Sequence, residues 1–303
     1  ASDVYKRQYS VSAIHALIVA AGSGRRFGAD CPKQYLPLTV NGTTQTVLQY
    51  SVQALARHPE IKACTLVVAP NDEFVNTLAF ALPVRLVAGG MERWQSVMYG
   101  VQKIAEHASN DDLILIHDAA RPCLELKDLT AVIDVAKNEH YGAILATAVV
   151  DTLKKSRADT STINTDSTNS APQSDDGNNA VATGVSCYID HTVSRQDIWQ
   201  AQTPQIYRLG ALLTVLDWLR KQHKTAQRQR LHLPKKSKSN NLYALDKHAL
   251  DKQQAIVSDE AMGFESLGLP IALVAGSASN IKLTYPSDLP LIEAILASQK
   301  RSP

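Results

Sequence analysis

The chain has 303 residues, of which 45% are hydrophobic, and a formal net charge of +2. This length and apolar content suffice for a large buried core, and the near-neutral balance by itself indicates no polyanionic partner. No stretch approaches the roughly 20 apolar residues of a membrane span. The start of the chain also lacks the apolar segment of a secretory signal. We therefore expect a cytoplasmic protein with no membrane partner.

The cysteines give a consistent indication. The four cysteines lie far apart and form no C-x-x-C pair, which argues against a zinc site or a disulfide framework; they are Cys31, Cys64, Cys123 and Cys187. This usage suits a reducing compartment. Residues 1–12 are polar and unpatterned, and we expect them to be a disordered tail.

Apolar runs typical of buried strands alternate with helical patterns along the chain. After an opening strand that begins at Ile14, strands are expected at 63–69, 84–88, 112–117, 143–150 and 271–275. Helices are expected at 46–57, 92–106, 126–138, 209–221, 259–267 and 287–300. Continuous apolar strands in a β-α-β order predict a mostly parallel, twisted sheet covered on both faces, an α/β, Rossmann-like three-layer sandwich. Ligands of such sheets bind beyond the carboxyl ends of the strands.

The opening strand runs into the glycine-rich stretch Ala20-Ala-Gly-Ser-Gly-Arg-Arg26, and Lys33 follows shortly after it. Glycine lets the backbone approach a phosphate, and free N–H groups in a turn form an anion-binding concavity. The spacing is not that of a dinucleotide fingerprint, because the third glycine, Gly28, comes one position late, nor that of a Walker loop. The pattern favours a polyphosphate-binding loop over a tight turn with solvated charges.

Two polar segments interrupt the alternation. Residues 156–184 contain almost no large apolar side chain, and they separate two alternating segments, 151–155 and 186–193, that predict a protruding hairpin arm over 150–195. Residues 220–252 carry ten Lys and Arg against two Asp. We expect flexible insertions at 156–184 and 223–254. For the basic segment a solvated loop is favoured over contact with nucleic acid or an acidic membrane.

Several motifs, in order along the chain, resemble the 2-C-methyl-D-erythritol 4-phosphate cytidylyltransferase family. They are the opening loop with Lys33-Gln-Tyr35, Gly89-Gly-x-Glu-Arg93 with Ser96, His117-Asp-Ala-Ala-Arg-Pro122, Val150-Asp-Thr152, Arg195, Gln202-Thr-Pro-Gln205, Ser258-Asp-Glu-Ala261 and Asn280-Ile-Lys-Leu-Thr284. The resemblance implies one nucleotidyltransferase domain over 13–303. It also implies CTP and methylerythritol phosphate as substrates, Mg²⁺ as cofactor, and a homodimer in which the hairpin arm reaches the neighbouring subunit.

The resemblance also assigns roles to residues. The catalytic cations would be Arg26, Lys33 and Lys282. CTP would be bound by Ala20, Ala21, Gly22, Gly24, Gly89, Gly90, Met91, Ser96 and Ala119. The acceptor would be bound by Asp118, Arg121, Thr152, Arg195, Thr203, Ser258 and Thr284, and Asp118 would also hold the metal. Met91 departs from the family, which usually has aspartate at that position.

Alternatives remain at this point. A related enzyme acting on ribitol 5-phosphate would need nearly the same cations, and a non-catalytic nucleotide-binding module could use the basic segment to recruit a polyanion. At the level of single residues, Asp118 could cap a following helix, Arg121 could pair with Asp118, and Arg195 could be an ordinary exposed arginine.

Overall fold

The computed structural model describes residues 13–22, 31–158, 187–232 and 259–299. The chain forms two compact units, one made of the residues up to 147 together with those from 201 onward, and one made of residues 148–200. We describe each unit by itself.

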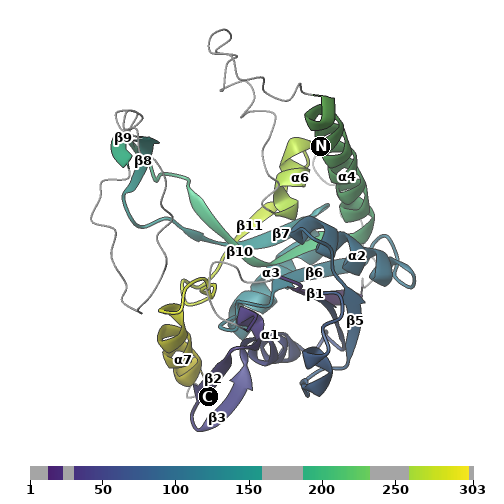
Figure 1. Ribbon diagram of the computed structural model, residues 1–303, viewed down its shortest axis with the longest axis vertical. Helices are drawn as coiled ribbons and strands as arrows, with labels where there is room; N and C mark the ends of the chain where they lie inside the picture. Colours follow the sequence, from purple (N-terminus) through teal and green to yellow (C-terminus); the bar gives the residue numbers. More distant parts are fainter. Residues whose placement is uncertain (1–12, 23–30, 159–186, 233–258, 300–303) are drawn as a thin grey trace, which may run out of the picture. The chain divides into compact units, whose positions relative to one another are not determined.

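The larger unit is built on a seven-stranded sheet in the order β11-β7-β10-β6-β1-β4-β5 (Figure 1). The strands are β1 (Ile14–Ala20), β4 (Cys64–Val68), β5 (Val84–Ala88), β6 (Leu113–Asp118), β7 (Gly142–Ala148), β10 (Trp199–Arg208) and β11 (Ala272–Ala275). Strand β1 pairs in parallel with both β4 and β6, and β11 pairs in parallel with β7. Strand β10 runs antiparallel to β6. The predicted mostly parallel α/β sheet is confirmed.

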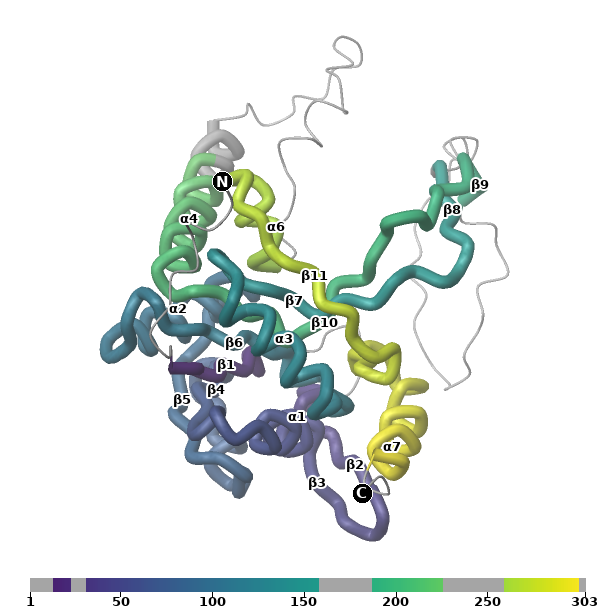
Figure 2. Tube along the Cα trace, turned by 180° about the vertical axis from the view of Figure 1, so that it is seen from behind, coloured from purple at the N-terminus to yellow at the C-terminus, as the bar shows by residue number. Residues whose placement is uncertain are grey.

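Helices cover both faces of this sheet, as Figures 1 and 2 show. They are α1 (Val47–Ala56), α2 (Arg93–Ala105), α3 (Leu126–Asn138), α4 (Leu209–His232) and α6 (Glu260–Ser266), whereas α7 (Asp288–Gln299) packs beside the hairpin that precedes α1. In β1, Ile18 packs with α1 and α3 in one apolar cluster, whereas Leu17 packs with α2, α4 and α6 in the other. Because successive strand residues point to opposite faces, burial of both explains the continuous apolar strands.

Local sequence signals set several boundaries. Helix α1 begins after Thr46, whose hydroxyl accepts the Gln49 N–H at 3.2 Å while the Gln49 carboxamide accepts the Thr46 N–H at 2.9 Å, a reciprocal cap. A short hairpin precedes it, formed by β2 (Pro37–Val40) and β3 (Thr43–Thr46). Together with α7 this hairpin encloses a third apolar cluster, which includes Leu283. That cluster fixes the segment just after Lys282 against the sheet domain.

The smaller unit is a two-stranded ribbon of β8 (Leu153–Ala158) and β9 (Cys187–Val193), paired antiparallel. The predicted hairpin is therefore present. Large apolar side chains of this unit are exposed, among them Val150, Tyr188, Ile189, Ile198 and Trp199. Residues 156–158, which were predicted to begin the flexible insertion, belong to β8 instead. The rest of that predicted insertion, 159–184, lies outside the described residues.

Two further differences from the expected elements concern β10 and α4. The sequence analysis did not predict β10, which lies inside the sheet between β7 and β6. Helix α4 continues to His232, past the expected end at Lys221 and into the segment expected to be a loop. Gln, Lys, Arg and Ala are among the better helix-forming residues, which explains the extension. None of the described helices is long and apolar enough to cross a bilayer.

Candidate active site

A pocket of about 350 Å³ opens at the carboxyl ends of β1 and β6, the position expected for a ligand in this fold. It is lined by Val19, Ala20, Ala21, Gly22, Lys33, Gln34, Gly90, Met91, Glu92, Arg93, Ser96, Asp118, Ala119, Ala120, Lys282 and Thr284. Most of the predicted nucleotide-binding and catalytic residues described by the structure therefore come together in one cavity.

One wall of the pocket is the loop between β5 and α2. The Gly90 N–H donates to the Ser96 hydroxyl at 3.1 Å, and that hydroxyl lies 3.3 Å from the Glu92 carbonyl. A Cβ on Gly89 would come within 2.5 Å of the Ala21 Cβ and 2.8 Å of the Ser96 oxygen. Glycine is therefore needed at position 89, because the loop packs closely on both the first strand and α2. Ser96 is buried, so its hydroxyl faces this loop and not the solvent.

The opposite wall carries Lys33 and Gln34. The Lys33 ammonium donates to the Leu283 carbonyl at 2.7 Å, and the Gln34 carboxamide donates to the Ala20 carbonyl at 2.7 Å. These bonds tie the segment after the opening loop to the end of β1 and to the segment that carries Lys282. The catalytic lysines predicted from the sequence, Lys33 and Lys282, thus line the same pocket.

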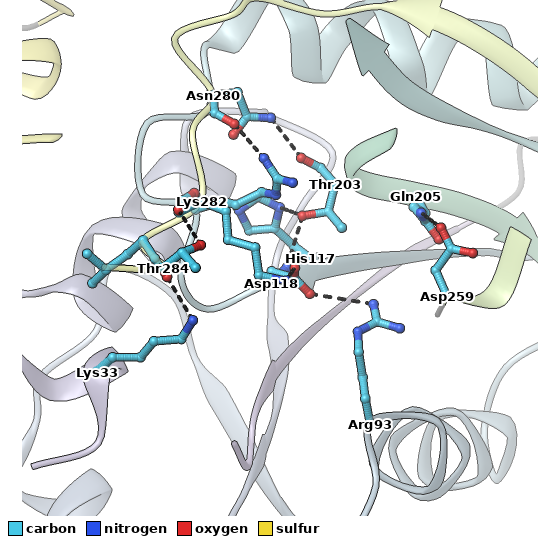
Figure 3. A network of polar contacts seen from close by, with 12 residues as sticks. Lys33, Arg93, His117, Asp118, Thr203, Gln205, Asp259, Asn280, Lys282 and Thr284 are labelled. Atoms are coloured by element: carbon cyan, nitrogen blue, oxygen red, sulfur yellow. Dashed lines mark hydrogen bonds and ion pairs between the residues drawn. The ribbon is translucent and has the colours of Figure 1, made fainter. Parts of the chain in front are cut away.

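Asp118 is the charged centre of the site (Figure 3). Its carboxylate lies 2.6 Å from the Lys282 ammonium and 3.5 Å from the Arg93 guanidinium. Burial by itself would raise the pKa of Asp118, but Arg93 and Lys282 outweigh it and hold this pKa well below its usual range. Asp118 is therefore ionised near pH 7. It does not cap a helix, since α3 begins only at Leu126, after Glu125.

Arg93 is in turn held by Glu260. Its guanidinium donates to both oxygens of the Glu260 carboxylate, at 2.7 and 2.9 Å, and the Glu260 side chain is only 1% exposed. Burial would lower the pKa of Arg93, but Glu260 and Asp118 raise it above its ordinary value. Glu260, Arg93, Asp118 and Lys282 therefore form a continuous row of alternating charges, and the last three of them line the pocket.

A buried polar layer behind Asp118 orients it. The Thr203 hydroxyl accepts the Asp118 N–H at 3.1 Å and lies 3.0 Å from His117 Nδ1, while His117 Nε2 lies 3.0 Å from the Arg121 carbonyl. Burial lowers the pKa of His117 to about 4, so its imidazole is neutral near pH 7. In this structure the hydroxyl of Thr203 positions Asp118, and its predicted contact with the acceptor stays a prediction.

Arg121 lies beside this layer. One of its terminal nitrogens donates to the Asn280 carbonyl at 2.6 Å, and burial lowers its pKa. The described ion pairs of Asp118 are made by Arg93 and Lys282 instead. Among the described residues, the buried Nε of Arg121 and Oδ1 of Asn280 have no hydrogen-bond partner. Such atoms can accommodate a bound polar group.

The structure leaves some predicted site residues untested. Gly24, Arg26 and Ser258 lie outside the described residues. Thr152 and Arg195 belong to the unit 148–200, where an Arg195 guanidinium nitrogen donates to the Val150 carbonyl. Met91 lines the pocket and is fully exposed.

Arg93 and Glu260 both lie in motifs that resemble the family, but no role was predicted for either residue from the sequence. No local sequence pattern could connect the two residues, because 167 positions separate them along the chain. Only the motifs that contain them pointed to the site. Gln34 and Glu92, which also line the pocket, likewise had no predicted role.

A mostly parallel sheet with a glycine-lined pocket, two lysines and a buried aspartate at its carboxyl edge suits the binding of a nucleoside triphosphate, as in a nucleotidyltransferase. A family model for 2-C-methyl-D-erythritol 4-phosphate cytidylyltransferase matches residues 14–175 and 221–298. The chain belongs to this family.

Similar proteins agree with the assignment. A 2-C-methyl-D-erythritol 4-phosphate cytidylyltransferase of Psychrobacter cryohalolentis is 43% identical and covers 94% of this chain and 93% of its own. One from Neisseria meningitidis is 35% identical over 93% of this chain and 96% of its own. A crystal structure of a 4-diphosphocytidyl-2C-methyl-D-erythritol synthase aligns with a TM-score of 0.63 at 30% identity, covering 94% of this chain and 99% of that one.

Proposed function

We propose that the protein transfers the cytidylyl group of CTP to 2-C-methyl-D-erythritol 4-phosphate and releases pyrophosphate. The observation that carries the proposal is the position of Lys33, Lys282 and Asp118 in one glycine-lined pocket of a chain that belongs to this family. A module that only bound a nucleotide would not need this set of charges.

The reaction is a direct in-line displacement. An oxygen of the acceptor phosphate attacks the α-phosphorus of CTP, the bond from that phosphorus to the bridging oxygen breaks, and pyrophosphate leaves with the electron pair. Because the acceptor phosphate is already an anion near pH 7, no general base is required. Catalysis then consists of positioning and charge stabilisation. Lys33 and Lys282, with Arg26 assigned the same role by resemblance, offset the repulsion between the two substrates.

Mg²⁺ is the proposed cofactor, and Asp118 is the residue that would hold it. Groups of three or more metal-ligating side chains are absent from the described residues. The pocket instead offers the ionised carboxylate of Asp118, which fits Mg²⁺ because this ion is usually held by one or two carboxylates together with substrate phosphates. The bound ion would supply positive charge beside the reacting phosphates. Lys282, which neutralises Asp118 here, would then be available to those phosphates.

A homodimer that uses the hairpin arm is also proposed. The two-stranded ribbon of β8 and β9 exposes Tyr188 and Ile189, and an isolated ribbon of this kind is marginally stable without a partner. In the dimer, Arg195 and Thr152 would contact the acceptor phosphate in the partner's pocket. Light scattering tests the dimer. Arg195→Ala tests the contact, with Arg157→Ala on the same arm as the control. The KM for the acceptor should rise only in Arg195→Ala.

A reducing compartment, the cytoplasm, is proposed as the protein's location. The support is that all four cysteines are free, and that Cys64 and Cys123 are buried in the core as ordinary apolar side chains. Retained activity in a reducing buffer, and no gain of stability under oxidising conditions, would agree with this location.

Pyrophosphate release tests the function. The purified protein should release pyrophosphate from CTP with Mg²⁺ and methylerythritol phosphate, and much less with UTP or with ribitol 5-phosphate. Faster turnover with ribitol 5-phosphate would replace the proposed acceptor. No turnover with either acceptor would favour the alternative of a non-catalytic nucleotide-binding module.

A further inference from the structure

Three side chains connect the start of α2 with the outer half of α4. The Trp94 indole N–H donates to the Glu92 carboxylate at 2.5 Å, and the His223 ring stacks on Trp94 with centroids 4.6 Å apart and planes 24° apart. The His223 Nδ1 lies 3.9 Å from the same Glu92 carboxylate. The two helices run side by side in Figures 1 and 2. Glu92, Trp94 and His223 therefore form one small cluster.

This cluster sits where α4 leaves the core. Leu219 is the last residue of α4 in the apolar cluster, and the next three residues are exposed. His223 turns back toward the domain, with a side chain 27% exposed, and covers Trp94, which is buried. An aromatic pair with offset or parallel rings contributes about 0.5–1.5 kcal/mol beyond its buried area. His223 thus fixes the outer half of α4 to the first turn of α2.

The first turn of α2 carries one wall of the pocket. Glu92 precedes α2 and lines the pocket, and its N–H donates to the Gln95 carboxamide at 3.1 Å. The next turn holds the preceding loop through the Gly90 N–H on Ser96. A Cβ on Gly90 would come within 2.4 Å of the Gln95 Cβ, so the loop and this turn are in close contact. A shift of Glu92 or Trp94 would therefore move the loop.

We propose that His223 is a positioning residue for nucleotide binding. By stacking on Trp94 and facing Glu92, it holds the first turn of α2, and with it the loop of Gly89 and Gly90, in the form that receives CTP. His223 does not line the pocket and acts through Glu92, which does. The inference rests on the proposed function, because it concerns the CTP of that reaction. It gives His223, the first residue of the predicted insertion 223–254, a role in substrate binding.

Calorimetric titration of the full-length protein with CTP tests the proposal. His223→Ala should raise the Kd for CTP about three- to tenfold, which is the equivalent of one lost stacking pair. His223→Phe keeps a ring on Trp94 and should bind CTP nearly as tightly as wild type. Lys224→Ala, the adjacent exposed position of the same helix, is the matched control and should leave the Kd unchanged.

Kinetics distinguish positioning from general damage. The His223→Ala variant should show a raised KM for CTP, with kcat and the KM for the acceptor close to wild type and a melting temperature lowered by no more than about 2–4 °C. A Kd equal to that of Lys224→Ala, a loss in His223→Phe as large as in His223→Ala, or equal rises in both KM values would overturn the proposal. Failure of the proposed function is a separate result, since wild type itself would then show no turnover.

Discussion

Lys282 and Asp118 form an ion pair in which the ammonium lies 2.6 Å from a carboxylate oxygen, although 164 positions separate the two residues. The Asp118 side chain is 12% exposed, whereas that of Lys282 is 41% exposed and faces the pocket. Asp118 retains a second cation, Arg93, on its other side. Lys282 can therefore move toward an incoming phosphate without leaving a buried carboxylate unpaired.

Replacing Lys282 with alanine should lower kcat by about a hundredfold or more, roughly 3 kcal/mol of transition-state stabilisation. The fold should persist, because Arg93 still pairs with Asp118. Pyrophosphate release under saturating substrates measures the loss. Lys127→Ala, which removes an exposed lysine paired with Glu125 on the surface, is the control and should keep wild-type kcat. A kcat for Lys282→Ala near wild type would remove Lys282 from the catalytic set.

His117 should make stability depend on pH. Burial lowers its pKa to about 4, from an ordinary value of about 6.5. Between these values the unfolded chain binds a proton that the folded chain does not, so the free energy of unfolding falls as the pH falls. Above about pH 6.5 the titration of His117 no longer changes the free energy of unfolding. Below that pH, His117 lowers this free energy by at most about 1.4 kcal/mol per pH unit.

Urea unfolding between about pH 7 and about pH 5 measures this effect, as the difference in slope between wild type and His117→Gln. The variant should be less stable at the upper end, since it disturbs the bonds to Thr203 and Arg121. Its stability should fall less steeply with acid. Equal slopes in the two proteins would show that His117 does not titrate differently on folding.

Gly89→Ala should weaken CTP binding and lower the melting temperature. The added methyl group would lie 2.5 Å from Ala21 and 3.2 Å from the Val68 carbonyl, so the strand ends or the loop must shift. Gly22→Ala is the control for stability, because a Cβ at Gly22 meets nothing within 4 Å. Calorimetry and thermal unfolding check both variants. A Gly89→Ala protein with unchanged melting temperature would mean that the loop adjusts freely.

The inner parallel strands β1, β4 and β6 were predictable because their residues are buried on both faces. Strand β5 and helix α3 have the bounds expected from apolar pattern alone. The hairpin of β2 and β3 was missed although Asn41-Gly42, at φ 50° and 80°, is a strong signal for a two-residue turn. The flanking strands are short, and only Leu38 and Val40 of the first are buried, so the apolar alternation was brief.

Strand β10 could not be read from an apolar pattern. Its middle contains Gln202, Thr203, Pro204 and Gln205, and proline is usually confined to edge strands. Here the polar side chains are buried because each has a hydrogen-bond partner: Thr203 meets Asp118 and His117, Gln205 donates to Asp259, and Gln202 donates to the Ser277 carbonyl. The resemblance assigned only Thr203 to the acceptor and gave Gln202 and Gln205 no role, because their bonds depend on tertiary contacts that no local pattern encodes.

The pair Arg93–Glu260 yields the last prediction, because it is the buried support of Asp118. Arg93→Met alone leaves the Glu260 carboxylate, 1% exposed, without its cation, and should destabilise the protein by about 3–5 kcal/mol. Glu260→Met alone should cost less, since the Arg93 side chain is 29% exposed and can still pair with Asp118. The double variant removes both buried charges, and its loss should be clearly smaller than the sum of the two single losses.

A double-mutant cycle of unfolding free energies, measured with denaturant near pH 7, tests this expectation. Lys103→Met with Glu106→Met, an exposed ion pair at the C-terminal end of α2, is the matched cycle and should show a coupling of less than about 1 kcal/mol. In both variants that lack Arg93, kcat should also fall, because Asp118 then has only Lys282 to keep it ionised and the lysine is held away from the phosphates. Additive losses of stability would show that Arg93 and Glu260 are not coupled. A wild-type kcat in the variants that lack Arg93 would show that Asp118 does not need this support.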